Sequence, residues 1–232
     1  MLSFDDYEFL TEARHKKIAG TNSKKQCIVF TDVCKSSELW ASGGASMFKA
    51  IMKHEEQIFR LAGKHDGSVV KSIGDAYMVV FDSLESGVRF AIDLQKEKPI
   101  KVGRDKIELR IGICYGDVYE YKTTRQGKEL LDYFGNTVNT ASRLESKVSE
   151  VGGFAFGFTS QVKKDERTRI LTIIEENCNG MKEYNYGEDK SASENRKRSG
   201  RLLNDSQDYI YRSIKNLNGV DEIFVYLVKG VK

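Results

Sequence analysis

Two aspartates stand at places in the sequence where a carboxylate is costly. Asp32 is the only carboxylate in the apolar, β-type run 27–34, and Asp75 lies between two further apolar runs. A buried carboxylate needs a positive partner, and two acids that converge at adjacent strand ends form an oxygen-rich site for Mg²⁺ and a phosphate. Each residue also has a structural interpretation, because Gly-Asp is a common hairpin tip and an aspartate after a strand often caps a helix.

Four other polar side chains are suited to holding an anion or a base. Lys71 shares a predicted strand face with apolar neighbours, so its ammonium group either reaches solvent or meets a specific acceptor. Arg110 alternates with apolar residues and lies on the face opposite to them, where an arginine is usually solvated. Asn139 and Arg143 are four residues apart on a predicted helix. This spacing places two donors on one face for a single anion, although such a pair is more often incidental.

Strands and helices alternate in the first half of the chain. The predicted elements are a strand over 27–33, a helix over about 37–63, strands over 69–73 and 76–81, and a helix over about 83–96. The two adjacent strands are joined only by Gly74 and Asp75. Because glycine stands first, this loop predicts a hairpin with a type II′ turn.

The second half of the chain continues the pattern. The predicted elements are two strands within 107–121, a helix from about 135, a strand over 154–158 and a closing strand over 222–228. The first two strands are expected to turn near 115–117, and Asn136 is the candidate N-cap of the helix. The order β-α-β-β-α-β, with additional strands and helices, predicts an α+β domain of ferredoxin-like design, in which helices cover one face of an antiparallel sheet.

Composition limits the number of domains. The chain has 232 residues, with 40% hydrophobic and 31% charged residues, near the globular average. We expect an N-terminal charged leader over 1–25, with a helix over about 5–19, and a single domain over 26–232. The stretch 181–200 is polar and charged, which predicts a mobile loop inserted into that domain.

Net charge and cysteine usage limit the partners and the compartment. A net charge of +3 does not by itself indicate nucleic-acid binding. No stretch approaches the roughly 18 consecutive apolar residues of a membrane span, and the acids near the N-terminus are unlike a secretory signal. The four cysteines stand far apart without metal-binding or redox spacing. We therefore expect a cytoplasmic protein with reduced thiols, no membrane span and no nucleic-acid partner.

Four short motifs resemble those of the class III nucleotidyl cyclases, the family of adenylyl and guanylyl cyclases. They are FTDVCKSSELW at 30–40, VKSIGDAYM at 70–78, RIGI at 110–113 and DYFGNTVNTASR at 132–143. Each motif alone is weak, but the four stand in the family's order and at family-like spacing. The resemblance is therefore strong, and it implies the catalytic fold of that family over about residues 26–160.

The resemblance also implies a metal site. Asp32 and Asp75, with the Val33 carbonyl, would hold two Mg²⁺ or Mn²⁺ ions per site. Arg110 and Ser37 would bind the substrate, Arg110 at its triphosphate. In the family the active site lies between two catalytic domains. Each of the two domains contributes one half-set of the site residues. This chain carries both half-sets, so the resemblance implies a homodimer with two shared sites.

The partner chain would complete each site with Lys71, Asp132, Asn139 and Arg143. The implied reaction is attack of the ribose 3′-hydroxyl on the α-phosphate, with pyrophosphate leaving. Asn139 would position the ribose, and Arg143 would stabilise charge on the α-phosphate. Adenine offers an acceptor at N1 and a donor at N6, which match a lysine donor and an aspartate acceptor. Guanylyl cyclases of this family carry Glu and Cys at these two positions, so the resemblance favours an adenylyl cyclase that makes 3′,5′-cyclic AMP from ATP.

Other functions stay open. Neighbouring residues of the motifs also resemble the guanylyl branch, and stand-alone pyrimidine cyclases have a similar size but lack the lysine. A degenerate cyclase domain would act as a nucleotide-binding or scaffolding module, although such domains typically lose a metal-binding aspartate or the arginine. A ferredoxin-like RNA binder would need aromatic residues on its central strands and a basic face.

One position departs from the family pattern. Asn218 stands where the last loop of the family carries a lysine that binds the triphosphate. Lys215 is the candidate replacement for that contact.

Overall fold

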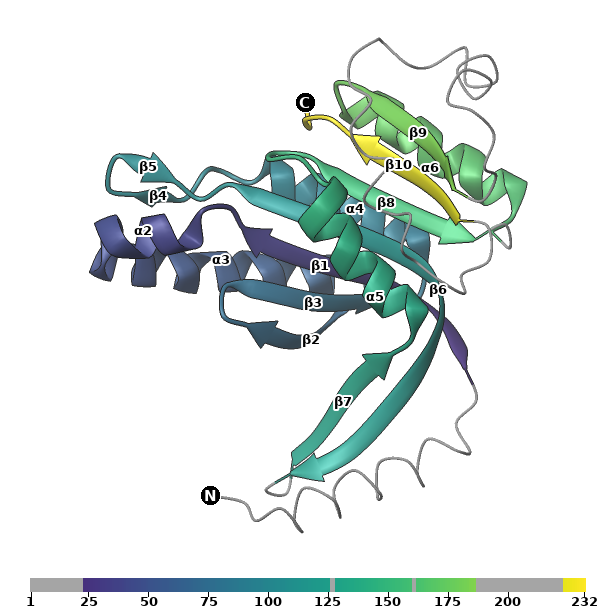
Figure 1. Cartoon of the computed structure of the whole chain (residues 1–232), viewed down its shortest axis with the longest axis horizontal. Coiled ribbons are helices and arrows are strands. Elements are labelled where there is room, and N and C mark those ends of the chain that lie inside the picture. The colour runs from purple at the N-terminus through teal and green to yellow at the C-terminus, as the bar shows by residue number, and fades with distance from the viewer. Residues whose placement is uncertain (1–22, 126–127, 160–161, 187–222) are drawn as a thin grey trace.

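The computed structural model describes residues 23–125, 128–159, 162–186 and 223–232. Its centre is an eight-stranded sheet in the order β2-β3-β1-β6-β8-β10-β9, with β7 paired to β6 off this path (Figure 1). The strands of this sheet are β1 (Lys24–Val33), β2 (Ser68–Ile73), β3 (Ala76–Phe81), β6 (Leu109–Arg125), β7 (Lys128–Phe134), β8 (Phe154–Thr159), β9 (Met181–Tyr186) and β10 (Ile223–Val228).

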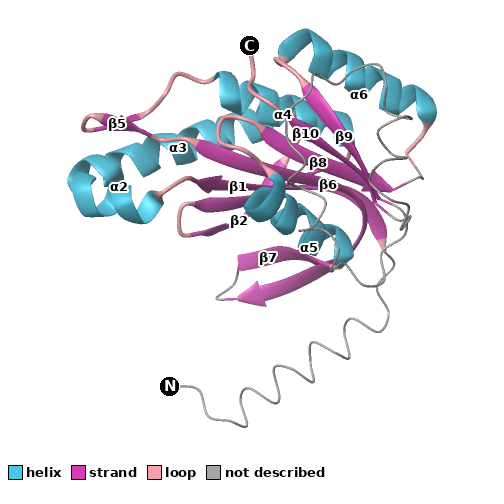
Figure 2. Ribbon diagram, turned by 45° about the horizontal axis from the view of Figure 1, so that its top comes forward, coloured by secondary structure: helices cyan, strands magenta, loops and turns pink. Residues whose placement is uncertain are grey.

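Helices connect these strands and cover the sheet. They are α2 (Ser36–Gly43), α3 (Ala45–Lys64), α4 (Leu84–Lys96), α5 (Asn136–Arg143), a π-helical turn η1 (Leu144–Val148) and α6 (Lys164–Asn177). A small hairpin of β4 (Lys101–Val102) and β5 (Asp105–Lys106) lies between α4 and β6. Figure 2 shows α5 on one side of the sheet and α3 and α4 on the other.

The first four long strands confirm the expected α+β, ferredoxin-like core. Along the chain they run β1, β2, β3 and β6, with helices after β1 and β3, and in the sheet they lie in the order β2-β3-β1-β6. All pairs among them are antiparallel, whereas β6 and β8 are parallel. The strand end that carries Asp32 therefore lies between the β2–β3 hairpin and β6.

Two hydrophobic cores form because apolar residues alternate along the central strands. Val29 and Ile113 point into a core with α3, α4 and α6, and Ile28 and Cys114 point into a second core with Ala141 and other residues of α5 and η1. The expectation of helices on one face only is therefore wrong. The third predicted helix packs against the opposite face, because its buried residues match the second set of strand positions.

The helix predicted over 37–63 is divided in two. Gly44 has φ +46° and separates α2 from α3, a conformation that glycine adopts without a steric penalty. Gly43 lies against Val102, and a Cβ atom at Gly43 would come 2.4 Å from Val102 Cγ1. The break therefore ends α2 where Gly43 packs against Val102 of the β4–β5 hairpin.

The hairpin at Gly74 and Asp75 forms as expected, and Gly74 has φ +67°. The turn predicted near 115–117 is wrong, because β6 continues through this segment while it pairs with β1 as far as Val118. Gly116 serves close packing instead, since a Cβ atom there would lie 2.8 Å from Thr137 Oγ1. The continued strand forms, with β7, an arm that projects from the sheet (Figure 1).

Two further expectations are corrected by the structure, and one lies outside the residues that it describes. Gly135, with φ +125°, is the N-cap of α5, and Asn136 is its first residue. The stretch predicted as a loop over 181–200 begins with strand β9, and only its part from 187 lies outside the described residues. The leader helix over 5–19 also lies outside the described residues. Helix α6 was not predicted from the sequence, because its buried apolar residues are few.

Candidate active site

Asp32 and Asp75 lie at the same edge of two neighbouring strands. The pairing of β1 with β3 ends at Thr31 opposite Tyr77, so Asp32 lies one residue beyond it and Asp75 two residues before Tyr77. Asp75 Oδ2 is buried and has no hydrogen-bond partner among the residues that the structure describes. An unpartnered buried carboxylate oxygen beside a second carboxylate fits a hard divalent cation. The Val33 side chain is buried, so that residue would contribute only through its backbone carbonyl.

Arg110 is placed directly against Asp32 by the strand register. Asp32 pairs with Arg110 between β1 and β6, and Arg110 Nη2 lies 2.6 Å from Asp32 Oδ2. The general expectation of a solvated arginine is wrong here, because the Arg110 side chain is 33% exposed and lies between two acids. The hydrogen bond to Asp32 is the main cause that raises the pKa of Arg110.

The second acid at Arg110 is Glu145, which the sequence reasoning missed. Its Oε1 lies 3.2 Å from Arg110 Nε, in a contact that is an ion pair without good hydrogen-bond geometry. Burial raises the pKa of Glu145 to about 7, against the opposing effect of Arg110. Glu145 is buried because it follows Ala141 by four residues on the apolar face of the helix. An acid within that apolar stripe was the signal in the sequence.

Close backbone packing brings Glu145 to this position. A Cβ atom at Gly112 would lie 2.1 Å from the Glu145 backbone nitrogen. Gly112 therefore lets η1 lie directly on β6, two residues after Arg110. The glycine of the RIGI motif has a packing role that supports the Arg110 site.

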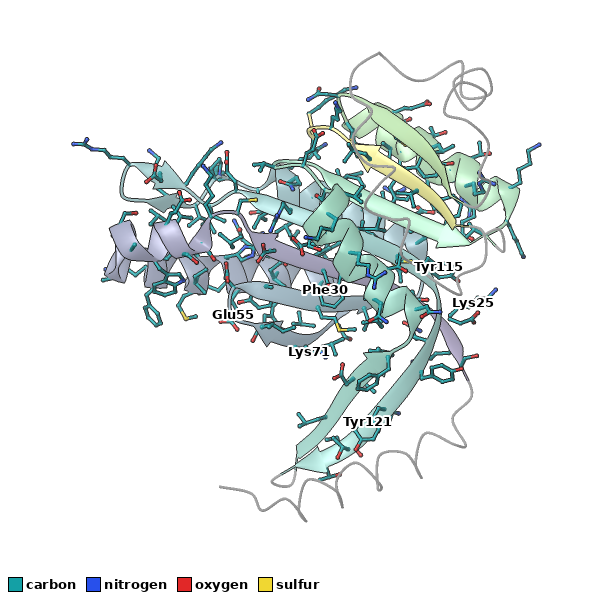
Figure 3. The ribbon with its side chains drawn as sticks, in the orientation of Figure 1. Lys25, Phe30, Glu55, Lys71, Tyr115 and Tyr121 are labelled. Carbon is teal, nitrogen blue, oxygen red and sulfur yellow. The ribbon has the colours of Figure 1, made fainter. Side chains whose placement is uncertain are left out.

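Lys71 and Asp132 form the second group of predicted site residues. Lys71 Nζ lies 2.8 and 2.7 Å from the two carboxylate oxygens of Asp132. Lys71, labelled in Figure 3, lies on β2 on the side that faces the arm of β6 and β7. The sequence left open whether the Lys71 ammonium group reaches solvent or meets a specific acceptor. The structure shows that it meets an acceptor, the carboxylate of Asp132. Asp132 Oδ1 also accepts a hydrogen bond from the Tyr133 N–H at 2.8 Å, which fixes the orientation of its carboxylate.

The remaining predicted site residues are solvent-exposed. Asn139 and Arg143 share one exposed face of α5, as their spacing predicts, and Thr140 and Ala141 face the core. Ser37 is exposed in the first turn of α2. Lys215 and Asn218 lie outside the described residues. The structure thus groups Asp32 with Arg110 and Glu145, groups Lys71 with Asp132, and leaves Asn139 and Arg143 on an open surface.

Comparison with known proteins identifies the family. The model of the adenylate and guanylate cyclase catalytic domain matches residues 19–152, which is more than half of the chain. The chain belongs to this family of cyclases. The candidate residues that the structure describes lie within the matched segment, whereas Lys215 and Asn218 lie beyond it.

The relatives of this cyclase include both nucleotide specificities. It is 31% identical to an adenylate cyclase of Podospora anserina over 142 residues, which cover 51% of this chain and 6% of that protein. It is 32% identical to the human guanylate cyclase soluble subunit beta-2 over 144 residues, which cover 56% of this chain and 23% of that protein. The cyclase thus spans less than a quarter of the length of either relative.

The fold agrees with a solved structure. The adenylyl cyclase CyaB from P. aeruginosa superposes with a TM-score of 0.59 at 19% identity, over 91% of this chain and 97% of that chain.

Within the part of this cyclase that the structure describes, no helix is long and apolar enough to cross a membrane. The described residues also contain no cluster of three or more His, Cys, Asp or Glu side chains suited to a metal. A cation at Asp32 and Asp75 would therefore need further oxygen ligands from the backbone, water or substrate.

Proposed function

We propose that this cyclase converts ATP to 3′,5′-cyclic AMP and pyrophosphate. The observation that carries the choice of ATP is the contact between Lys71 and Asp132, whose Nζ and Oδ2 lie 2.7 Å apart. The pair offers a donor beside an acceptor, as the N1 and N6 groups of adenine require. Binding of adenine would exchange this internal ion pair for two hydrogen bonds to the base.

A guanylyl cyclase is the second candidate, because guanylate cyclases are among the relatives. Guanine has an acceptor at O6 and a donor at N1, which reverses the positions of donor and acceptor along the base edge. Lys71 and Asp132 would then each meet a group of their own kind, which supports ATP over GTP. A degenerate nucleotide-binding module is disfavoured, because Asp32, Asp75 and Arg143 are all present.

The metal residues fit two Mg²⁺ or Mn²⁺ ions per site. Ions held by Asp32, Asp75 and the Val33 carbonyl would supply Lewis-acid activation of the 3′-hydroxyl and stabilise charge on the leaving pyrophosphate. Glu145 remains a counterion for Arg110 when Asp32 is engaged elsewhere, and the other nitrogens of the guanidinium group are then available to the triphosphate.

A homodimer would complete the site. Asn139 and Arg143 lie on an exposed face of α5, where they are accessible to a nucleotide held by a second chain. Asn139 would orient the ribose, and Arg143 would stabilise the charge that develops on the α-phosphate. All four cysteines are free thiols, which supports the cytoplasm as the compartment.

Incubation of the chain with each of the four ribonucleoside triphosphates, with Mg²⁺ or Mn²⁺, tests this function. Mass spectrometry of the products should find 3′,5′-cyclic AMP in excess over the other cyclic nucleotides. Asp75→Ala, which removes a metal ligand, should abolish the product. Predominance of cyclic GMP would contradict the choice of substrate, and no cyclic product with either metal would contradict the activity.

A further inference from the structure

A cavity of about 1020 Å³ lies beside the Asp32–Arg110 pair. Its walls come from the β1–α2 turn, from α2, from the start of β6 and from the β4–β5 hairpin. Cys34, Lys35, Leu39, Arg104 and Arg110 are among its lining residues. Neither Lys71 nor Asp132 lines it, so the cavity is separate from the pair assigned to the base.

The side chains around this cavity are rich in cations. Five lining residues are basic and three are acidic; the basic ones are Lys35, Lys101, Arg104, Lys106 and Arg110, and the acidic ones are Glu38, Asp105 and Glu108. Two of the cations are already paired, one with Glu108 at 3.0 Å and one with Asp32 at 2.6 Å. Within the described part of the chain, the other three form no ion pair. Of the three acids only Glu108 is in an ion pair among the described residues, so the lining as a whole carries a net charge of +2. A cavity of net positive charge attracts an anion.

The N-terminal end of α2 lies at the same cavity. Lys35, at the N-cap of α2, has φ +55°, and no side chain caps the helix. The first N–H groups of a helix lack partners within it and carry a partial positive charge. Because Lys35 itself lines the cavity, the positive end of α2 and the cations of the hairpin lie at one surface.

The hairpin is fixed against α2 by packing. Val102 of β4 is buried and lies against Gly43 at the end of α2, where a Cβ atom would come 2.4 Å from Val102 Cγ1. Gly103, with φ +62°, makes the tight turn that follows. The hairpin therefore holds Lys101 and Arg104 beside the cavity on a short, anchored support.

We propose that the β4–β5 hairpin is a polyphosphate-binding element, in which Lys101 and Arg104 bind the phosphates of the nucleoside triphosphate farthest from the ribose. This inference rests on the proposed cyclase function, which places the triphosphate at Arg110. Arg110, Lys101 and Arg104 line one cavity, so a triphosphate bound at Arg110 would share that cavity with the hairpin. Arginine suits this task because its planar guanidinium group binds phosphate oxygens in pairs.

Calorimetric titration with inorganic tripolyphosphate tests this element without turnover. The double variant Lys101→Gln with Arg104→Gln should bind tripolyphosphate about tenfold more weakly than the original chain, equivalent to about 1.4 kcal/mol, with a smaller dependence on salt. Its affinity for adenosine should be unchanged. Lys98→Gln is the matched control, because Lys98 is exposed nearby but lines a different cavity. It should bind tripolyphosphate like the original chain.

An unchanged affinity of the double variant for tripolyphosphate would overturn the proposal, as would equal losses for tripolyphosphate and adenosine. Both substituted residues are exposed, and an unchanged melting temperature will show that the variant is folded. Failure of the hairpin site can be distinguished from failure of the proposed cyclase function. A chain that makes no cyclic nucleotide, but whose tripolyphosphate affinity depends on Lys101 and Arg104, supports the hairpin site and contradicts the function. An active cyclase whose double variant keeps its KM for ATP and its tripolyphosphate affinity overturns the hairpin site alone.

Discussion

The two aspartates proposed to bind metal, Asp32 and Asp75, have opposite surroundings. Asp32 is neutralised by Arg110 at 2.6 Å, whereas the buried Oδ2 of Asp75 has no hydrogen-bond partner. A cation would therefore meet one carboxylate that is already compensated and one that is not. The gain in stability on metal binding should depend strongly on Asp75.

Asp75→Asn should remove most of the stabilisation that Mg²⁺ gives the folded chain. A ligand at about 100 times its Kd stabilises the folded state by about 2.7 kcal/mol, and the neutral amide removes the charge that attracts the ion. Thermal unfolding with and without Mg²⁺ measures the effect. Asp117→Asn, at an exposed position, is the control and should keep the shift. An equal Mg²⁺ shift in Asp75→Asn would contradict the metal assignment.

Lys71→Glu combined with Asp132→Cys should shift the substrate preference from ATP towards GTP. Each mispaired buried polar contact costs roughly 1–3 kcal/mol, so two contacts would change the preference by about two to four decades if they were additive. Neighbouring contacts are rarely additive, which makes the direction firmer than the size. The measurement is the ratio of kcat/KM for the two nucleotides. Equal losses for ATP and GTP would show that these residues do not select the base.

At the scale of elements, the sequence predicted those parts that have a regular period or a required glycine. The β2–β3 hairpin follows from Gly74, and α4 follows from apolar spacing and is capped by Ser83, whose Oγ accepts from the Ser86 N–H. The turn at 115–117 was predicted wrongly, because Gly116 in this strand serves close packing against Thr137. Local sequence does not distinguish a glycine that turns the chain from one that admits a neighbour.

The sequence predicted the site residues that belong to motifs, and it missed one residue whose position depends on tertiary packing. Motif residues gave Asp32, Asp75, Lys71 and Asp132, and the structure adds that the last two contact each other. Glu145 was missed, because its contact with Arg110 depends on η1 packing against β6 on the second face of the sheet. That face was expected to be uncovered, so the acid within the apolar stripe of the helix was not linked to Arg110.

Helix α3 contains a buried titratable residue that predicts a pH dependence. His54 is 0% exposed, its ring nitrogens have no hydrogen-bond partner in the described part of the chain, and it packs edge-on against Tyr77. Burial lowers the pKa of His54 from 6.5 to about 4. Between these values the unfolded chain binds more protons, so stability is full above pH 6.5 and is lost as the pH falls towards 4. The loss from this residue should reach about 3 kcal/mol.

Urea unfolding at several pH values from 7 to 4.5 measures this dependence. His54→Leu should reduce the slope of unfolding free energy against pH. Gln57→Leu, three residues later in the same helix, should change the free energy without changing the slope. An unaltered slope in His54→Leu would show that His54 is not held neutral in the folded chain.

At the scale of the whole molecule, the candidate residues form separate half-sets. Among the described ion pairs and hydrogen bonds, the network of Asp32, Arg110 and Glu145 shares no member with the pair Lys71–Asp132. Arg143 lies on the exposed face of another element, α5. Two copies related by a twofold axis would present each half-set to its complement twice. The central claim is therefore an adenylyl cyclase whose sites are shared between chains.

Mixing two inactive variants tests this claim most directly. Asp32→Ala inactivates the half-set that would bind the metal ions, and Arg143→Ala inactivates the half-set that would stabilise the transition state. Each homodimer should therefore be inactive with ATP. After subunit exchange, half of the dimers are mixed and each has one intact site, which predicts about a quarter of the original cyclic AMP production. Fluorescence energy transfer between labelled chains reports the exchange. Recovery of activity on mixing supports the shared site, and no recovery despite demonstrated exchange would contradict it.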